Sequence, residues 1–137
     1  MIKITQEKFG DDLEQTMYKE LAGHAREQMG CSEITEVIAF VAKDNDLLAG
    51  AVAVQPFWGT LHIKLLVVKK EFRLQKIATK LMQRVFEYGK ENNCRFAFLE
   101  TFSFQALSFY QKLGFQLEFT RHGYSHDVSF HYLRKDF

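Results

Sequence analysis

The chain has 137 residues, the length of one domain rather than two. Its 18 basic and 17 acidic residues give a formal charge of +1, which argues against a dedicated nucleic-acid binder. A hydrophobic fraction of 47% excludes a disordered chain, and no apolar run reaches the roughly 20 residues of a membrane span. Neither Cys31 nor Cys94 belongs to a metal-ligand pattern, and the amino terminus lacks a signal peptide's apolar stretch, so we expect a cytoplasmic protein with reduced thiols.

The first 30 residues predict a strand and a helix. Residues 2–5 can form a short opening strand. Apolar residues spaced four apart then form a single stripe, which predicts a helix over residues 12–29. We expect Asp11 or Asp12 to cap its start and Gly30 to end it.

Three short apolar segments follow and predict an antiparallel meander. Residues 36–43 and 48–55 are strand-like and enclose the turn at residues 44–46. We expect Pro56 to end the second strand, because proline has no backbone N–H to donate. Residues 59–68 predict the third strand, whose inner face would hold Leu61, Ile63, Leu65 and Val67, alternating with Thr60, His62, Lys64 and Leu66.

The second half of the chain alternates helices and strands. A double apolar stripe predicts a helix over residues 74–90, followed by a strand at residues 95–100. A helix from residue 104 or 105 to residue 113 and two strands, near residues 115–121 and 129–133, complete the chain. This order predicts one mixed α/β domain whose sheet of six to seven strands is mostly antiparallel, with helices on both faces and one parallel pair.

The small net charge conceals an uneven distribution. Residues 1–46 carry 5 basic and 10 acidic side chains, whereas residues 64–84 carry seven basic side chains and one acidic side chain. The basic block falls where the strand ending at Val68 runs into the double-stripe helix. Free N–H groups and the positive end of the helix dipole at such a junction suit a phosphate. We therefore expect an anionic ligand of the pyrophosphate type.

Two motifs resemble those of the GCN5-related N-acetyltransferases. The run RLQKIA at residues 73–78, after Leu66 and Val68, is similar to the family motif Arg/Gln-x-x-Gly-x-Gly/Ala. Residues 103–115, SFQALSFYQKLGF, resemble the second motif, Asn-x-x-Ala-x-x-Phe-Tyr-x-Lys-x-Gly-Phe. The resemblance covers about residues 1–135. The chain departs from the family's pattern at Leu74 and Lys76, where glycine is common, and at Ser103, where asparagine is common.

The resemblance implies acetyl-CoA as the acetyl donor. Backbone groups at the end of the third meander strand would pair with pantetheine, and N–H groups of the following loop would hold the pyrophosphate. The cofactor-binding residues that it implies are Leu66, Val67, Val68, Arg73, Leu74, Gln75, Lys76, Ile77, Ala78, Thr79, Ser103, Gln105 and Tyr110. We expect no metal at the carboxyl-terminal histidines, because their spacings of four and five residues are too loose for a hairpin.

The resemblance also implies direct attack of an amine on the thioester. Tyr110 stands where the family places the general acid that protonates the leaving thiolate. His62 and Glu100 are alternative general bases, and an ordered water is a third candidate. Histidine changes its charge near neutral pH, which suits the role. The backbone N–H of Val68 would hold the oxyanion.

The sequence leaves the acceptor open, and we expect a primary amine of a small molecule. Phe57 and Trp58 either wall an acceptor pocket or cap the core. The acidic first segment could attract a cationic amine such as a polyamine. The alternatives are a non-catalytic acyl-CoA-binding module and an enzyme that acts on a protein amine. We expect neither nucleic acid nor membrane as a partner, and a homodimer stays open.

Overall fold

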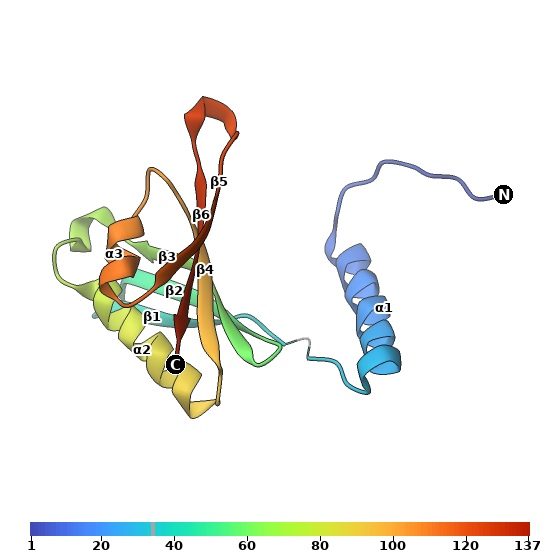
Figure 1. The fold of residues 1–137 in the computed structure, drawn as a ribbon, viewed down its shortest axis with the longest axis horizontal. Coiled ribbons are helices and arrows are strands. Elements are labelled where there is room, and N and C mark those ends of the chain that lie inside the picture. The colour runs from blue at the N-terminus through green and yellow to red at the C-terminus, as the bar shows by residue number, and fades with distance from the viewer. Residues whose placement is uncertain (34) are drawn as a thin grey trace. The chain divides into compact units, whose positions relative to one another are not determined.

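The computed structural model describes residues 1–33 and 35–137, which fall into two units, Met1–Ile34 and Thr35–Phe137 (Figure 1). The first unit contains helix α1 (Asp11–Met29), as its stripe predicted. Gly30, at φ 77°, ends the helix as expected, and its N–H donates to the carbonyl of Arg26. Whether the two units make one domain stays a prediction.

Two predictions for the first unit are wrong. Gly10 precedes α1 without a side-chain cap, and Asp11 and Asp12 lie inside the first turn instead. There the two carboxylates still favour the positive end of the helix dipole. Residues 2–5 form no strand. A strand needs a neighbour for its backbone groups, and this unit offers only a helix.

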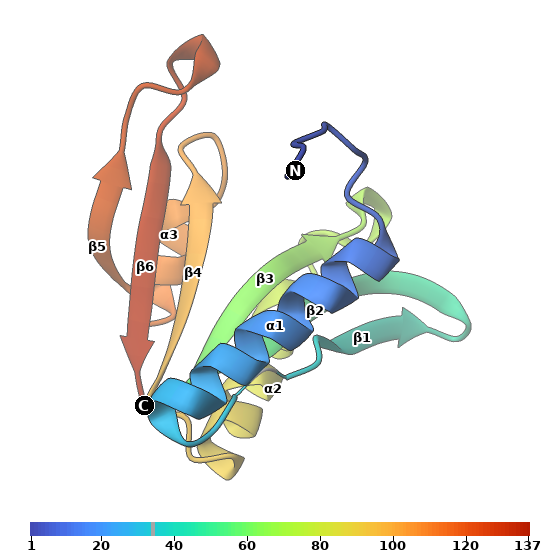
Figure 2. The same cartoon turned by 90° about the vertical axis from the view of Figure 1, so that its right-hand side faces the viewer.

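The second unit is a six-stranded sheet in the order β1-β2-β3-β4-β6-β5 (Figure 2). Only β3 and β4 are parallel, because a helical crossover joins them, so the predicted mixed, mostly antiparallel sheet is confirmed. The strands are β1 (Ile38–Asp44), β2 (Leu47–Phe57), β3 (Thr60–Val68), β4 (Phe96–Phe102), β5 (Gln116–Arg121) and β6 (Phe130–Asp136). The helices are α2 (Ile77–Glu91) and α3 (Leu107–Lys112), with 3-10 turns at Lys70–Phe72 and Ser125–Asp127.

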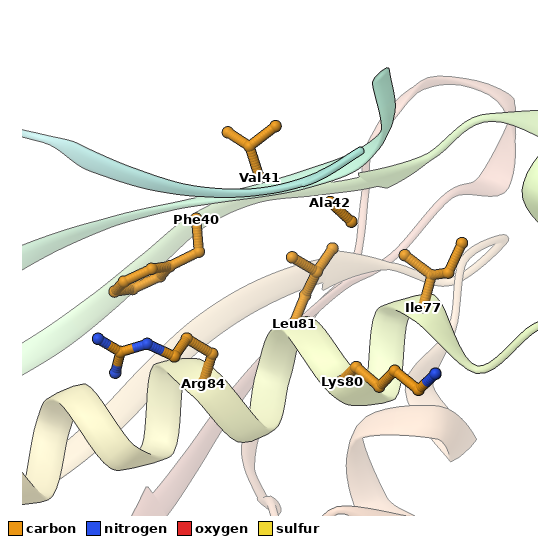
Figure 3. Close-up of a pocket in the computed structure, with 7 residues that line it drawn as sticks. All are labelled: Phe40, Val41, Ala42, Ile77, Lys80, Leu81 and Arg84. Atoms are coloured by element: carbon orange, nitrogen blue, oxygen red, sulfur yellow. The ribbon is translucent and has the colours of Figure 1, made fainter. Parts of the chain in front are cut away.

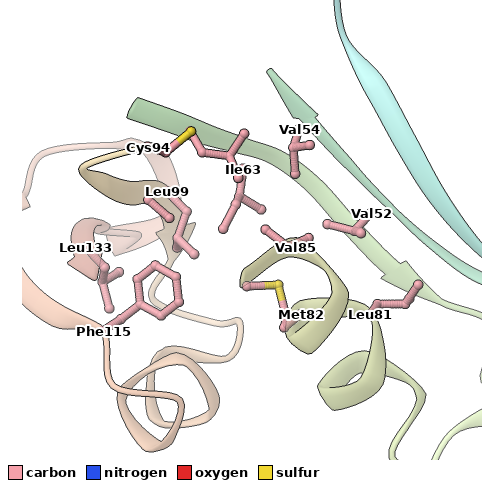
Figure 4. Close-up of a cluster of buried hydrophobic side chains, with 12 residues drawn as sticks. Val52, Val54, Ile63, Leu81, Met82, Val85, Cys94, Leu99, Phe115 and Leu133 are labelled. Carbon is pink, nitrogen blue, oxygen red and sulfur yellow. The ribbon is translucent and has the colours of Figure 1, made fainter. Parts of the chain in front are cut away.

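The core lies between one face of this sheet and the two helices of the unit (Figure 4). Helix α2 buries Leu81, Met82 and Val85 there, and α3 packs against the same cluster. Each large side chain buried in this way contributes roughly 1.5–3 kcal/mol to folding. The sheet contributes Val52, Val54, Leu61, Ile63, Ala97, Leu99 and Leu133, and the connections contribute Cys94 and Phe115. Both helices of this unit therefore cover one face, and the prediction of helices on both faces stays open for α1.

Proline does not end β2, contrary to the prediction. The strand continues through Pro56 to Phe57, and Pro56 pairs with Leu61 of β3. On its other side β2 pairs with β1 only as far as Val54. Pro56 therefore sits where β2 has one neighbour, and its missing N–H breaks no ladder of hydrogen bonds.

A β-bulge in β3 changes which side chains face the core. Ala53 pairs with Leu65 and Val54 pairs with Ile63, so Lys64 is the extra residue. One extra residue inverts the alternation of the side chains beyond it. Leu65 and Val67, predicted for the inner face, are accordingly 66% and 59% exposed. That part of the prediction is wrong, while Leu61 and Ile63 are buried as expected.

Candidate functional site

Strands β3 and β4 pair only at their beginnings and then diverge (Figure 2). The pairs are Leu61 with Ala97 and His62 with Phe98. Beyond these pairs β3 keeps only β2 as a neighbour, and β4 keeps only β6. The facing edges of the two strands therefore leave backbone N–H and C=O groups free for an extended ligand between them.

The amino terminus of α2 follows the open end of β3. The helix begins at Ile77, three residues later than predicted, and no side chain caps it. Its first turn contains no acidic residue. The N–H groups of Ile77, Ala78 and Thr79 precede the first helical hydrogen bond, from the Lys80 N–H to the Lys76 carbonyl. These groups and the helix dipole make the end of α2 attractive to an anion.

The loop before α2 contains two residues in the left-handed region of backbone conformation. Leu74 has φ 67° and Lys76 has φ 58°. These are the two positions where the resembling family has glycine. The backbone therefore adopts a conformation that glycine favours, although both residues have a Cβ. The Leu74 side chain points fully into solvent and fills none of the space inside the loop.

Replacing Lys76 with glycine is expected to raise the free energy of unfolding by about 1 kcal/mol, because it relieves this strain. Urea unfolding of Lys76→Gly and Lys76→Ala measures the effect. The alanine variant keeps the Cβ and the strain, so it should gain nothing. Equal stability of the two variants would show that the backbone at residue 76 is unstrained.

His62 and Glu100, predicted as alternative bases, lie together at the point where β3 and β4 diverge. The Nε2 atom of His62 lies 2.8 Å from Oε2 of Glu100. The imidazole also stacks on Phe98, with ring centroids 4.5 Å apart and planes 2° apart. Both polar side chains are about one-quarter exposed. The ring is thus fixed from two sides and still open to a ligand.

The hydrogen bond selects the tautomer of His62. An ionised carboxylate only accepts hydrogen bonds, so Nε2 of His62 is the donor to Glu100. The neutral ring then has its lone pair on Nδ1, and within the described part of the chain no hydrogen bond occupies that atom. This arrangement leaves Nδ1 free to accept a proton, while the carboxylate stabilises the imidazolium that results.

Tyr110 lies on α3, at the edge of the core. Its ring packs edge-on against Phe109 and Phe115, with centroids 5.2 and 5.8 Å away. Burial raises the pKa of the Tyr110 phenol above its ordinary value, so the group is protonated at neutral pH. In the described chain no side-chain or backbone group bonds to its hydroxyl, and that oxygen is not sealed from solvent. The hydroxyl is therefore available to a ligand.

Two predicted cofactor ligands have local hydrogen-bond partners. Oγ of Ser103 accepts from the N–H of Ser129 at 3.0 Å. Oε1 of Gln105 accepts from the N–H of Phe102 at 3.0 Å and from Oγ1 of Thr101 at 3.2 Å. These bonds hold the turn between β4 and α3. The geometry indicates that both side chains shape this turn, and their role in cofactor binding stays a prediction.

A cavity of about 490 Å³ lies at the paired ends of β3 and β4. Phe57 and Trp58 both line this cavity. Two roles were predicted for them, and this position favours the wall of a pocket over a cap on the core. Phe96, Phe98 and Tyr132 also line the cavity, although their sequence pattern did not lead us to predict them as site residues. The signal was present, because these residues alternate with the buried Ala97, Leu99 and Leu133 along β4 and β6.

A second cavity, of about 330 Å³, lies between β1 and α2 (Figure 3). Lys80 and Arg84 line it beside Phe40, Ala42 and Leu81. The Arg84 guanidinium lies over the Phe40 ring, 4.8 Å from its centroid. Arg84 therefore lies on the side of α2 that faces β1. Not every basic side chain of residues 64–84 is directed at the end of β3, where the pyrophosphate was expected.

The remaining predicted groups take ordinary positions. Cys31 is exposed, Cys94 is buried, and both are free thiols. Among the residues that the structure describes, no three potential ligands form a metal cluster, and Nδ1 of His131 lies 2.8 Å from Oγ1 of Thr120. No helix in this part of the chain is both long and apolar enough to cross a membrane.

Comparisons with known proteins show what this chain is similar to. N-alpha-acetyltransferase 30 of Schizosaccharomyces pombe is 40% identical over 84 residues, which are 56% of each protein. The chain thus spans just over half the length of this curated relative. A crystal structure from Agrobacterium tumefaciens, proposed to be an acetyltransferase, covers 100% of both chains with a TM-score of 0.87 and 23% identity.

A second solved structure contains the expected donor. It is that of a proposed streptothricin acetyltransferase from Bacillus anthracis with bound acetyl-coenzyme A. The match covers 74% of this chain and 62% of that chain, with a TM-score of 0.67 and 23% identity. In addition, the sequence model of the acetyltransferase (GNAT) family matches residues 3–115. The chain therefore belongs to the acetyltransferase (GNAT) family.

Proposed function

We propose that this protein transfers the acetyl group of acetyl-CoA to a primary amine of a small molecule. The observation that carries the proposal is the His62–Glu100 pair at the point where β3 and β4 diverge. Nδ1 of His62 has a free lone pair there, and the gap between β3 and β4 beside it suits an extended acetyl donor such as acetyl-CoA. Family membership supplies the acetyl-transfer chemistry.

Acetyl-CoA fits the gap and the helix end together. Its pantetheine arm would lie along the free edge of β3, with backbone hydrogen bonds to Leu66, Val67 and Val68. Its pyrophosphate would receive the N–H groups from Arg73 to Thr79. The exposed Lys76 and the neighbouring basic side chains add positive charge at that end of the ligand.

The affinity for acetyl-CoA is expected to fall as the salt concentration rises, because charge contributes to holding the pyrophosphate. Calorimetric titration at 50 and 300 mM salt measures this dependence. An affinity that does not change with salt would contradict a contribution of the basic side chains of residues 64–84 to pyrophosphate binding. No binding at millimolar acetyl-CoA would remove the proposed donor.

The reaction would proceed by direct attack. Nδ1 of His62 takes a proton from the amine, whose nitrogen attacks the thioester carbonyl. The tetrahedral oxyanion accepts a hydrogen bond from the Val68 N–H. The C–S bond then breaks, the Tyr110 hydroxyl protonates the departing thiolate, and the products are an N-acetyl amine and CoA. Neither Cys31 nor Cys94 is needed, which agrees with the burial of Cys94 in the core.

A second candidate acceptor is the amine at a protein's amino terminus. The observation that favours it is the 40% identity to a relative named N-alpha-acetyltransferase. The third candidate is an acyl-CoA-binding module without turnover, as expected if Lys76 and the lack of a carboxylate on β3 have removed turnover.

Thiol release from acetyl-CoA in the presence of single acceptors distinguishes the three candidates. A panel of small primary amines is compared with short peptides that differ only in an acetylated or free amino terminus. The proposed function predicts release with small amines. Release only with free peptide amino termini would identify a protein acceptor, and bound but unreacted acetyl-CoA would identify the module.

A further inference from the structure

We infer that the cavity of about 490 Å³ at the paired ends of β3 and β4 binds the aromatic body of the acceptor amine. This inference rests on the proposed function, since it names the class of acceptor for the same site. The acceptor would be a primary amine that a short alkyl arm joins to an aromatic ring.

The walls of the cavity are aromatic. Five rings line it from three strands and the β2–β3 turn, namely those of Phe57, Trp58, Phe96, Phe98 and Tyr132. Its volume lies within the range of roughly 300–1,000 Å³ found for small-molecule sites. Such rings gain energy from apolar contact and from stacking or edge contacts with a ligand ring.

The cavity adjoins the catalytic pair through one residue. Phe98 lines the cavity and stacks on His62 at 4.5 Å. The same ring makes an edge contact with Phe57, with centroids 6.1 Å apart. A ligand ring that packs against these walls is thus one side chain away from His62. We therefore expect a short alkyl arm to bring the amine of such a ligand to the base.

The charges of the cavity disfavour a polycation. Arg95 and Arg134 line it together with a single carboxylate, Glu118. Arg134 lies over the Phe96 ring at 3.7 Å and pairs with Asp136 at 2.7 Å, so part of its charge is compensated. A polyamine would meet two guanidinium groups and one carboxylate. An aromatic monoamine places only its ring among them.

The backbone of Trp58 is a second and independent observation. Trp58 and Gly59 are the two residues between β2 and β3, and both have positive φ, 47° and 77°. Two-residue hairpin turns of this kind favour Asn-Gly, and a bulky residue with positive φ is strained. Stability alone therefore favours asparagine at residue 58. A role of the Trp58 ring in lining the cavity explains why the chain has tryptophan at this strained position.

The test compares 2-phenylethylamine with ethylamine and spermidine as acceptors for the wild-type protein and for Trp58→Asn. We expect 2-phenylethylamine to have the highest kcat/KM. Trp58→Asn should lower its kcat/KM at least tenfold, mainly through KM, and should leave ethylamine unchanged. The variant should unfold at no lower urea concentration than the wild type. Leu117→Ala, an exposed apolar residue outside the cavity lining, should behave as the wild type.

Binding measured without turnover separates this inference from the proposed function. If 2-phenylethylamine binds to the wild type but not to Trp58→Asn, and no amine is acetylated, the cavity assignment stands and the proposed function fails. If spermidine is the better acceptor, or a peptide alone is acetylated, the inference is overturned. An equal effect of Trp58→Asn on all three amines, or no binding of 2-phenylethylamine, also overturns it.

Discussion

Replacing His62 with glutamine is expected to lower kcat by at least about 100-fold, the lower range for loss of a positioned general base. Glutamine can keep a hydrogen bond to Glu100 and much of the shape of histidine, but it cannot accept the proton of the amine at neutral pH. The affinity for acetyl-CoA should not change, because in the proposed mechanism the imidazole contacts the acceptor amine rather than acetyl-CoA. Steady-state kinetics and calorimetric titration of the same preparation measure both quantities.

Glu100→Gln is the matched variant that assigns the roles within the pair. An amide oxygen can still accept the hydrogen bond from Nε2 of His62, but it no longer stabilises the imidazolium by charge. We therefore expect a smaller loss of kcat than in His62→Gln. The dependence of kcat on pH should keep its acidic limb in Glu100→Gln and lose it in His62→Gln. The reverse pattern would make Glu100 the base and His62 its positioning residue.

Replacing Tyr110 with phenylalanine is expected to lower kcat by about 100-fold and to leave the fold intact. The substitution removes only the hydroxyl, which has no hydrogen-bond partner in the described chain, and keeps the ring contacts with Phe109 and Phe115. The proton for the departing thiolate must then come from water. Thiol release measures the loss, and urea unfolding confirms the unchanged stability.

The same hydroxyl gives a pH dependence with a definite sign. Burial raises the pKa of Tyr110, so the unfolded chain releases this proton at a lower pH than the folded chain does. The folded state is therefore expected to lose stability as the pH rises above about 10, the ordinary pKa of tyrosine. Tyr110→Phe should lose less stability over that range. An equal alkaline loss in both proteins would contradict the assignment.

The mixed sheet with one parallel pair was predictable from the sequence because long, periodic segments determine the order of helices and strands along the chain. The double stripe of α2 has one place to pack, and a strand on each side of that helix requires a parallel crossover. The bulge at Lys64 was not predictable from alternation. Polarity alternates only from Thr60 to Leu65, and residues 65–68 are all apolar, so neither pattern marks Lys64, and only pairing with β2 shows the extra residue. The prediction of a strand at residues 2–5 was wrong for a related reason, because a strand forms only where another strand pairs with it.

The chemistry of the site was predictable in kind but not in arrangement. His62 and Glu100 are 38 positions apart, and only the pairing of His62 with Phe98 brings them together. The left-handed backbone at Leu74 and Lys76 was suggested only by the family's glycines, because neither residue favours it. The aromatic cavity depends on the register of β4 and β6, which no single segment determines.

The most direct test of the proposed acetyl transfer is mass spectrometry of the products from acetyl-CoA and 2-phenylethylamine incubated with the wild-type protein. Direct transfer should give one N-acetylated amine for each CoA released, with no acetyl group left on Cys31 or Cys94. Acetyl-CoA that binds and stays intact with this amine and with every other acceptor would contradict it.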